Sequence, residues 1–317
     1  MTARSGWAWV GAAGVEDGVE ALRARDEAGD WQVIVLSEEA LPAYDRVGLS
    51  SYVGVWEASE LALPGNEYAG DVLVDLRLGE KAESIDREAR KVVTTSGDVV
   101  GYDALVLATG HRARTIRALD GFDNVHTLRH FDDAVTIRET LRDATRLAVL
   151  GTGFIGSEIA SAAAARGIDV TLIGTSSFPL ARSVGPLAGR MLAALHEDAG
   201  LTLLPDSGLA DISARDNRID SIRTSCGRDV PVDAVVVGIG STPATDWLAA
   251  STVELDPASG AVVCDSTMAT SAPAVWAAGD VASVDGAPGG HWTSATAKGF
   301  VAGANAVGAQ QTYAGVP

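Results

Sequence analysis

Residues 147–158 read LAVLGTGFIGSE, an apolar run that ends at a glycine and continues into two more spaced glycines. The apolar run, the G-x-G-x-x-G spacing and the alanine-rich residues that follow predict a strand, a tight turn and a helix. In such a unit the first glycine permits the turn and the second lets a pyrophosphate approach the backbone. The third brings the helix close to the strand, and the helix N-terminus presents unpaired N–H groups.

A second apolar run at residues 169–173 completes a strand–helix–strand unit around this turn. A glycine-rich turn without a ligand is the alternative reading of the spacing alone. Because strand, helix and strand frame the glycines in the expected order, the sequence predicts that a dinucleotide binds in the middle of the chain.

A similar unit opens the chain. Residues 7–10 predict a strand, residues 11–18 (GAAGVEDG) a turn and residues 19–25 a helix, and residues 31–36 predict a second strand. Glu38 follows that strand at the position where an acid holds a ribose hydroxyl. The sequence therefore contains two dinucleotide-binding units, a loose internal duplication.

The glycine turn of the first unit departs from the pattern. Counted from Gly11, the second and third glycine positions hold Ala13 and Glu16, and Asp17 adds another carboxylate at the helix start. Two unit charges about 6 Å apart repel by roughly 3 kcal/mol at an effective dielectric constant near 20, so a phosphate there would be disfavoured. Acidic residues also cap ordinary helix N-termini. Both readings predict an intact fold with an altered ligand site.

Composition limits the classes of partner. The chain has 317 residues, enough for two domains with separate cores, and its formal net charge is −18, from 42 acidic and 24 basic residues. No basic patch offsets this charge, which argues against nucleic acid or an anionic membrane as a partner. With no secretory leader before the first strand and no apolar stretch of 18 residues, we expect a cytoplasmic protein without membrane segments.

The cysteines and histidines predict no metal site and no redox-active disulfide. Cys226 and Cys264 stand 38 positions apart, with no C-x-x-C pair. Of the five histidines, His126 and His130 are four apart, but the residues between them are strand-like, which disfavours a shared metal.

Five further short motifs follow one another along the chain. They are AYDRVGLS at residues 43–50, ATG at 108–110, GIG at 238–240, GD at 279–280 and HWTSA at 291–295. With the two glycine turns, this order resembles the FAD-dependent pyridine nucleotide-disulfide oxidoreductase superfamily of two-dinucleotide-binding flavoproteins. Within it the chain is most similar to ferredoxin and rubredoxin reductases and to the N-terminal part of nitrite reductase large subunits.

The resemblance implies an α/β fold of two Rossmann-like dinucleotide-binding domains in three layers, the second inserted into the first. Residues 1–117 and 245–317 would form an FAD-binding domain and residues 118–244 an NAD(P)H-binding domain, with no C-terminal interface domain.

The resemblance also implies the site residues. Those implied for FAD are Gly11, Gly14, Glu38, Arg46, Ala108, Thr109, Gly110, Gly279, Asp280, His291, Trp292 and Thr293. Those implied for NADH or NADPH are Gly151, Gly153, Phe154, Ile155, Gly156, Gly238 and Gly240. Asp280 would hold the ribityl chain, the helix beginning near Thr293 would point its N–H groups at the flavin, and Glu158 would sit where the nicotinamide meets the flavin, as the catalytic residue.

Two further departures bear on function. Ser51 stands where many ferredoxin reductases have a lysine that pairs with the glutamate matching Glu158, whereas members similar to nitrite reductase more often have serine. Residues 174–177 (GTSS) follow the second strand of the central unit without an acid for a ribose 2′-hydroxyl and without an adjacent arginine for a 2′-phosphate, so the choice between NADH and NADPH stays open.

The resemblance predicts an enzyme that passes electrons from NAD(P)H through FAD to an external acceptor, an iron–sulfur protein or a partner enzyme or subunit. A flavin-deficient member that serves as a nucleotide-binding, structural or regulatory subunit is the alternative, because of the altered first turn. A flavoenzyme that acts on an organic substrate is a third hypothesis. The sequence does not specify the oligomeric state.

Overall fold

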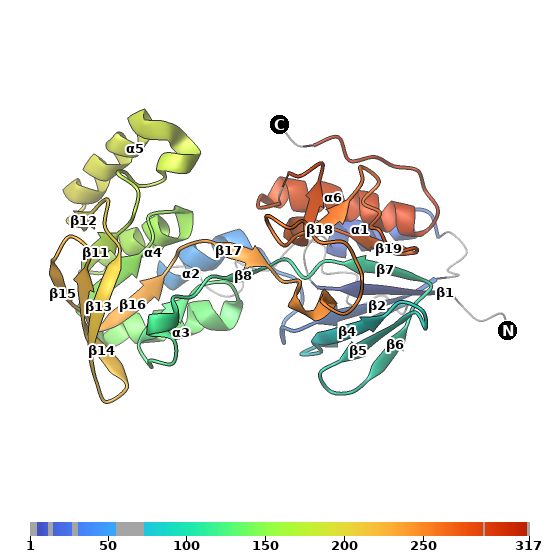
Figure 1. Ribbon diagram of the computed structural model, residues 1–317, viewed down its shortest axis with the longest axis horizontal. Helices are drawn as coiled ribbons and strands as arrows, with labels where there is room; N and C mark the ends of the chain where they lie inside the picture. Colours follow the sequence, from blue (N-terminus) through green and yellow to red (C-terminus); the bar gives the residue numbers. More distant parts are fainter. Residues whose placement is uncertain (1–4, 12–14, 27–30, 55–72, 288, 316–317) are drawn as a thin grey trace. The chain divides into compact units, whose positions relative to one another are not determined.

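A computed structural model describes residues 5–11, 15–26, 31–54, 73–287 and 289–315. The chain divides into two compact units, and each is described by itself (Figure 1). Unit 1 comprises Met1–Tyr44, Ala62–Arg112 and Thr242–Pro317, and unit 2 comprises Asp45–Leu61 and Ala113–Ser241. β8 (His111–Ala113) and β17 (Ser241–Pro243) pair where the chain passes from one unit to the other.

A five-stranded parallel sheet forms the middle layer of unit 1. Its strand order is β19 (Val275–Ala277), β7 (Ala104–Leu107), β1 (Ser5–Val10), β2 (Trp31–Ser37) and β3 (Val74–Leu78). Both faces of a parallel sheet must be covered, which explains why β7 reads ALVL and is buried throughout.

Helices and a small antiparallel sheet cover the two faces of this sheet (Figure 1). The helices are α1 (Val15–Arg23) and α6 (Trp292–Ala306), which pack against each other. The antiparallel strands are β4 (Ala82–Asp86), β5 (Lys91–Thr94) and β6 (Val99–Gly101). A separate pair of strands in unit 1 consists of β18 (Val262–Cys264) and β20 (Ala282–Val284). Three layers enclose one core, to which Val33, Val92 and Leu105 contribute fully buried side chains.

Unit 2 is built around a second five-stranded parallel sheet. Its order is β12 (Thr202–Leu204), β11 (Asp169–Ile173), β10 (Arg146–Leu150), β16 (Ala234–Val237) and β9 (Val125–Thr127). The helices packed on its strands are α3 (Phe131–Asp143), α4 (Phe154–Ala164) and α5 (Ala181–Asp198). An antiparallel sheet of β13 (Leu209–Arg215), β14 (Arg218–Thr224) and β15 (Asp229–Pro231) closes the other face, where Ile222 packs with Ala148 and Val235.

The two sheets follow the same winding. In unit 1 the chain runs from β1 through α1 to β2, and β7 then pairs on the other side of β1; in unit 2 it runs from β10 through α4 to β11, and β16 pairs on the other side of β10. Each sheet therefore has a topological switch point at the carboxyl end of its central strand, where doubly wound sheets bind ligands. The expected α/β fold of two Rossmann-like units is confirmed.

Residues 45–54 pack differently from the expected division of the chain, which counted them with the first domain. They form a short 3₁₀ turn, η1 (Arg46–Gly48), and α2 (Leu49–Gly54), and α2 packs against α3 and α4 in unit 2. The units change at residues 112/113 and 241/242, a few residues from the expected boundaries at 117/118 and 244/245.

Among the described residues, no helix combines the length and apolarity that crossing a membrane requires. In the same part of the chain, no three His, Cys, Asp or Glu side chains gather in a way that suits a metal ion.

Candidate functional site

The glycine turn after β10 is held by close backbone packing. The N–H of Gly151 donates to the carbonyl oxygen of Ile173 at 2.8 Å, and Gly151 has a φ of +114°. A Cβ at Gly151 would lie 2.2 Å from the carbonyl oxygen of Gly238, and one at Gly156 would lie 2.0 Å from the carbonyl oxygen of Gly151. The first and third glycines are therefore required by the turn and by the approach of α4 to β10.

Gly153 has a different environment. It precedes the first residue of α4, no side chain caps the helix there, and a Cβ built on it would meet no atom within 4 Å. The two residues that follow, Phe154 and Ile155, expose 53% and 41% of their surface. An uncapped helix N-terminus that faces open space is the arrangement that accepts a phosphate group, because its N–H groups have no partner within the helix.

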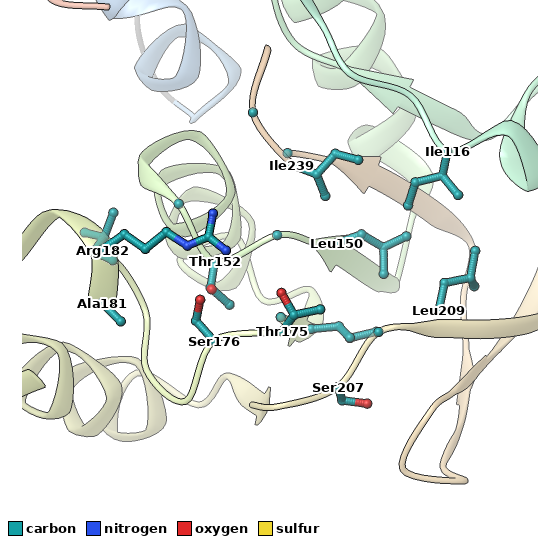
Figure 2. Close-up of a pocket in the computed structure, with 18 of the residues that line it drawn as sticks. Ile116, Leu150, Thr152, Thr175, Ser176, Ala181, Arg182, Ser207, Leu209 and Ile239 are labelled. Carbon is teal, nitrogen blue, oxygen red and sulfur yellow. The ribbon is translucent and has the colours of Figure 1, made fainter. Parts of the chain in front are cut away.

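A cavity of about 380 Å³ lies at this switch point (Figure 2). The loops after β10, β11 and β16 and the start of α5 surround it. The lining residues are Ile116, Leu150, Gly151, Thr152, Gly153, Ile173, Gly174, Thr175, Ser176, Leu180, Ala181, Arg182, Ser183, Ser207, Gly208, Leu209, Gly238, Ile239 and Gly240. This lining is mostly apolar, with hydroxyl groups and one guanidinium, which is the usual character of a nucleotide pocket.

Glu158 lies in the second turn of α4, exposed, and its carboxylate accepts a hydrogen bond from the hydroxyl of the buried Ser50 in α2. The sequence directed attention to Ser51, whose side chain lies outside the described part of the structure. Because α2 packs against α4, Ser50 fixes the orientation of Glu158, a contact that residue spacing alone does not reveal.

Arg46, expected beside the flavin, lies in unit 2. Its Nη1 donates to the carbonyl oxygen of Arg129 at 3.0 Å and lies 3.4 Å from Nδ1 of His130, the residue that precedes α3. Its contact with a flavin stays a prediction.

The first turn of unit 1 repeats the geometry of the second. Gly11 has a φ of +112°, and its N–H donates to the carbonyl oxygen of Leu36 at 2.8 Å. A Cβ there would lie 2.1 Å from the carbonyl oxygen of Ala108, whose own N–H donates to Val10 at 2.7 Å. Gly11 and Ala108 thus correspond to Gly151 and Gly238, although only the second pair consists of two glycines.

Gly18 lies in α1, two residues after the position counted as the third of the turn, and packs on β1. A Cβ at Gly18 would lie 2.2 Å from the ring of Trp9, and one at Gly156 would lie 3.4 Å from Val149. Trp9 precedes Gly11 by two residues, as Val149 precedes Gly151. Gly18 therefore lets α1 pack directly on the ring of Trp9, whereas the closest contact at Gly156 is the carbonyl oxygen of Gly151.

Counted from Gly11, the third glycine position falls on Glu16, and the effect of that residue on the turn stays a prediction. A bulky, fully buried Trp9 occupies the strand, and the helix meets it through a glycine one half-turn further on. Ala13 and Gly14 lie outside the described residues, as does the side chain of Glu16, so their expected effects on a phosphate stay predictions.

The other residues expected to bind FAD follow parallel strands of unit 1 or begin α6. Glu38 follows β2 and pairs with Nζ of Lys81 at 3.1 Å, and the hydroxyl of Thr109, two residues after β7, donates to the carbonyl oxygen of Ala244 at 2.8 Å. Gly110 is the next residue and has a φ of +64°. Because parallel strands end at one edge of a sheet, these residues share the edge that holds Gly11.

Gly279 and Asp280 follow β19 at the same edge. A Cβ at Gly289 would lie 2.6 Å from Cα of Asp280, so the chain passes closely over this aspartate. His291, Trp292 and Thr293 are exposed at the N-terminus of α6, where no side chain caps the helix. A tight turn, an acid after the second strand and an uncapped helix N-terminus are the features that fit a flavin dinucleotide, so the residues present fit the group.

Sequence reasoning missed Lys298, which is 2% exposed in α6. Its Nζ donates to the carbonyl oxygen of Ala282 at 2.8 Å and lies 5.7 Å from the ring centre of Tyr313. Burial lowers the pKa of this ammonium, while the charges of Asp280 and Cys264 oppose the shift. A lysine inside a small-residue helix has no recognisable spacing signal, so only the structure reveals it.

Comparisons with known proteins agree with this geometry. The family model for pyridine nucleotide-disulphide oxidoreductases matches residues 11–299. The chain is 32% identical to the ferredoxin–NAD(+) reductase component of the biphenyl dioxygenase system of Paraburkholderia xenovorans strain LB400, over 85% of this chain and 66% of that protein. It is 31% identical to rhodocoxin reductase of Rhodococcus erythropolis, over 86% of this chain and 63% of that protein.

Among solved structures, the ferredoxin reductase for the CYP199A2 system of Rhodopseudomonas palustris is similar to this chain. The TM-score is 0.90 and the identity 28%, over 99% of this chain and 79% of that one. The chain spans about two thirds of the length of the first two relatives. Since the family model covers most of the chain and the fold agrees, the chain belongs to the pyridine nucleotide-disulphide oxidoreductase family.

Proposed function

We propose that the chain is a flavin-dependent NAD(P)H oxidoreductase, in which electrons pass from NAD(P)H through FAD to an external acceptor. The single observation that carries this proposal is the repeated switch-point turn, Gly11 against Ala108 in unit 1 and Gly151 against Gly238 in unit 2. Two such turns supply two dinucleotide sites in one chain. Relatives named as NAD(+) reductases support the same reading.

In this proposal unit 2 binds the nicotinamide nucleotide. The N-terminus of α4 receives the pyrophosphate at Gly153, where the backbone borders open space. Glu158, oriented by Ser50, is the residue that meets the nicotinamide end of the nucleotide.

Unit 1 binds FAD, with Gly11 at the pyrophosphate, Glu38 at the adenosine ribose and Asp280 at the ribityl hydroxyls. Hydrogen bonds from sugar-like hydroxyls suit a carboxylate acceptor. The N-terminus of α6, from Trp292, presents its partial positive charge, which stabilises negative charge nearby. FAD, when bound, supplies the electron-transfer chemistry, and the protein supplies binding and orientation.

An iron–sulfur protein or a partner enzyme is the acceptor we propose, because relatives are named as ferredoxin and rubredoxin reductases. The cytoplasmic location expected from the sequence stays a prediction.

A flavin-deficient subunit is the second candidate, and the first turn of α1 favours it. Asp17 lies in that turn, and burial raises the pKa of its carboxyl, although a backbone hydrogen bond opposes the shift. A carboxyl group at this position competes with a phosphate for the helix N-terminus.

The visible absorption spectrum of the purified protein, with and without added FAD, separates the two candidates. Flavin bands that bleach with NADH or NADPH are the result expected of the reductase. A colourless protein that takes up no added FAD would contradict the proposal and support the flavin-deficient reading.

Gly153→Asp tests the nicotinamide site independently of the flavin. We expect this variant to fold and to lose nucleotide binding, because its carboxylate enters the open space at the helix N-terminus. Ser161→Asp is the matched control, because it adds the same charge to an exposed position of α4 away from its N-terminus. Unchanged nucleotide binding by Gly153→Asp would refute the assignment.

A further inference from the structure

The end of β11 lacks the acid by which dinucleotide folds recognise NADH. In such folds a carboxylate after the second strand accepts a hydrogen bond from the adenosine ribose 2′-hydroxyl. Here β11 is followed by Gly174, whose N–H donates to the carbonyl oxygen of Leu204 at 3.1 Å. Among the described residues that line the adjoining cavity there is neither aspartate nor glutamate.

The side chain of Thr152 fills the space that an acidic side chain at position 174 would need. A Cβ at Gly174 would lie 2.5 Å from Cγ2, 2.7 Å from Oγ1 and 3.1 Å from Cβ of Thr152. Threonine is branched at Cβ and has few alternative rotamers, so it does not swing aside freely. An acidic side chain at position 174 is therefore excluded as long as Thr152 occupies this space.

Hydroxyl groups and an arginine line this part of the cavity instead. Thr175, Ser176 and Ser183 contribute hydroxyls, and Arg182 extends its guanidinium into the cavity from the start of α5, toward Thr152 and Ser176 (Figure 2). Neutral hydroxyls and a guanidinium are donors that suit an anion rather than a neutral ribose hydroxyl.

The loop between β11 and α5 holds Arg182 in this position. The N–H of Leu180 donates to the carbonyl oxygen of Thr152 at 2.8 Å, and Leu180 has a φ of +55°, so the loop turns back onto the glycine turn before α5 begins. An arginine eight residues beyond Gly174 thereby reaches the same corner of the cavity.

One carboxylate lies next to this corner. Asp206 precedes the lining residue Ser207, and its carboxylate accepts a hydrogen bond from the hydroxyl of Ser177 at 2.8 Å. Neither Asp206 nor Ser177 belongs to the lining, so the charge that faces the cavity is that of Arg182.

We propose that this chain selects NADPH over NADH, with Arg182, Thr175 and Ser176 as the binding site of the adenosine 2′-phosphate. The inference rests on the proposed binding of a nicotinamide nucleotide to unit 2. It names a specificity that differs from the names of the relatives, which are NAD(+) reductases. A guanidinium pairs with a phosphate through two parallel hydrogen bonds and gains little from a neutral hydroxyl.

Calorimetric titration of the protein with NADP⁺ and NAD⁺ tests the proposal without any turnover. We expect NADP⁺ to bind at least tenfold more tightly, and 2′,5′-ADP to bind more tightly than 5′-AMP by a similar factor. Equal affinity, or tighter binding of NAD⁺, would overturn the preference while leaving the proposed function intact. Failure of all four compounds to bind would overturn both.

The variant Arg182→Gln tests whether Arg182 is responsible for the preference for NADP⁺ over NAD⁺. We expect the affinity for NADP⁺ to fall about tenfold or more, as the loss of a charge-assisted pair implies, and the affinity for NAD⁺ to change less than twofold. Arg142→Gln is the matched control, since Arg142 is exposed in the last turn of α3 and does not line the cavity. A variant at Arg182 that loses both nucleotides equally, or neither, would contradict its role at the 2′-phosphate.

Discussion

At the scale of single residues, the same requirement for a small residue appears at both switch points. Gly11 and Gly151 have nearly the same φ and each faces a carbonyl oxygen across the turn. The sequence predicted both, because a glycine that ends an apolar run has a recognisable signature. The sequence also showed that no acid stands at Gly174, but not that Thr152, from another loop, leaves no room for a side chain there.

Gly151→Ala should destabilise unit 2 by about 4 kcal/mol. Roughly half of this arises from the backbone conformation and half from the contact with the carbonyl oxygen of Gly238. Urea unfolding measures the change. Gly167→Ala is the control, since Gly167 also has a positive φ but its Cβ would meet no atom within 4 Å, and it should cost only about 1 kcal/mol. Equal losses in the two variants would show that the close contact contributes nothing.

Asp233→Asn should remove a contribution to stability that depends on pH. The carboxylate accepts hydrogen bonds from the guanidinium and N–H of Arg146 and from the hydroxyl and N–H of Thr145, which tie the start of β10 to the residue before β16. The hydrogen bond from the Arg146 side chain, followed by those from Thr145, holds the pKa of Asp233 well below its usual range.

Because the folded pKa of Asp233 is depressed, its stabilising effect is present above the unfolded pKa near 3.9 and is lost as the pH falls toward the folded pKa. We expect a difference of about 1 kcal/mol between native protein and variant at pH 7, since the pair is partly exposed. Urea unfolding should show this difference persisting to pH 5 and shrinking below about pH 4. A difference that does not change with pH would contradict the role of the carboxylate charge.

At the scale of elements, the strand–turn–helix unit at β10 and α4 was predictable because every glycine in it stands at its expected spacing. The corresponding strand, turn and helix at β1 and α1 were predicted too, but the packing of Gly18 on Trp9 was not. Trp9 is a large, fully buried ring, and a Cβ at Gly18 would lie 2.2 Å from it, a contact that glycine spacing does not indicate. The hydrogen bond between Ser50 and Glu158 was missed for a related reason, because the sequence of neither helix indicates that α2 packs on α4.

The crossing of α1 and α6 depends on small residues, and Gly303→Ala tests it. A Cβ at Gly303 would lie 2.3 Å from the carbonyl oxygen of Gly18 and 2.6 Å from its Cα, so the two helices must separate. We expect a loss of about 2–3 kcal/mol in the free energy of unfolding of unit 1. Gly101→Ala should change it by less than about 0.5 kcal/mol, because the nearest atom there is 4.0 Å from the new Cβ. A similar small change at Gly303 would mean that the helices approach less closely.

At the scale of the whole molecule, the order of motifs along the chain predicted that one nucleotide unit is inserted into another. The assignment of residues 45–54 to unit 2 was not predictable, because a short helix reveals its partners only after folding. The position of Arg182 in the nucleotide cavity was not predictable either, because it depends on a loop that folds back on Thr152.

Binding of a nicotinamide nucleotide should stabilise unit 2 more than unit 1. At 100 times its dissociation constant, NADPH should stabilise the folded form of its site by about 2.7 kcal/mol. Hydrogen exchange should show slower exchange in β10, β11 and β16 of unit 2, with little change in β1 and β2 of unit 1. Inorganic phosphate at equal ionic strength is the control. Equal protection of both sheets would contradict the placement of the site at the β10 switch point.

The division of unit 1 between distant parts of the chain has a consequence for its synthesis. β7 ends at Leu107, but its neighbour β19 lies at Val275–Ala277 and α6 follows later still. A ribosome that adds about 5–20 residues per second needs roughly 10–30 s to make the intervening segment, so unit 2 emerges complete while the first sheet still lacks an edge strand and a covering helix. During that interval the apolar face of β7 is exposed on the nascent chain, and a chain released early in this window would present an open strand edge to its neighbours.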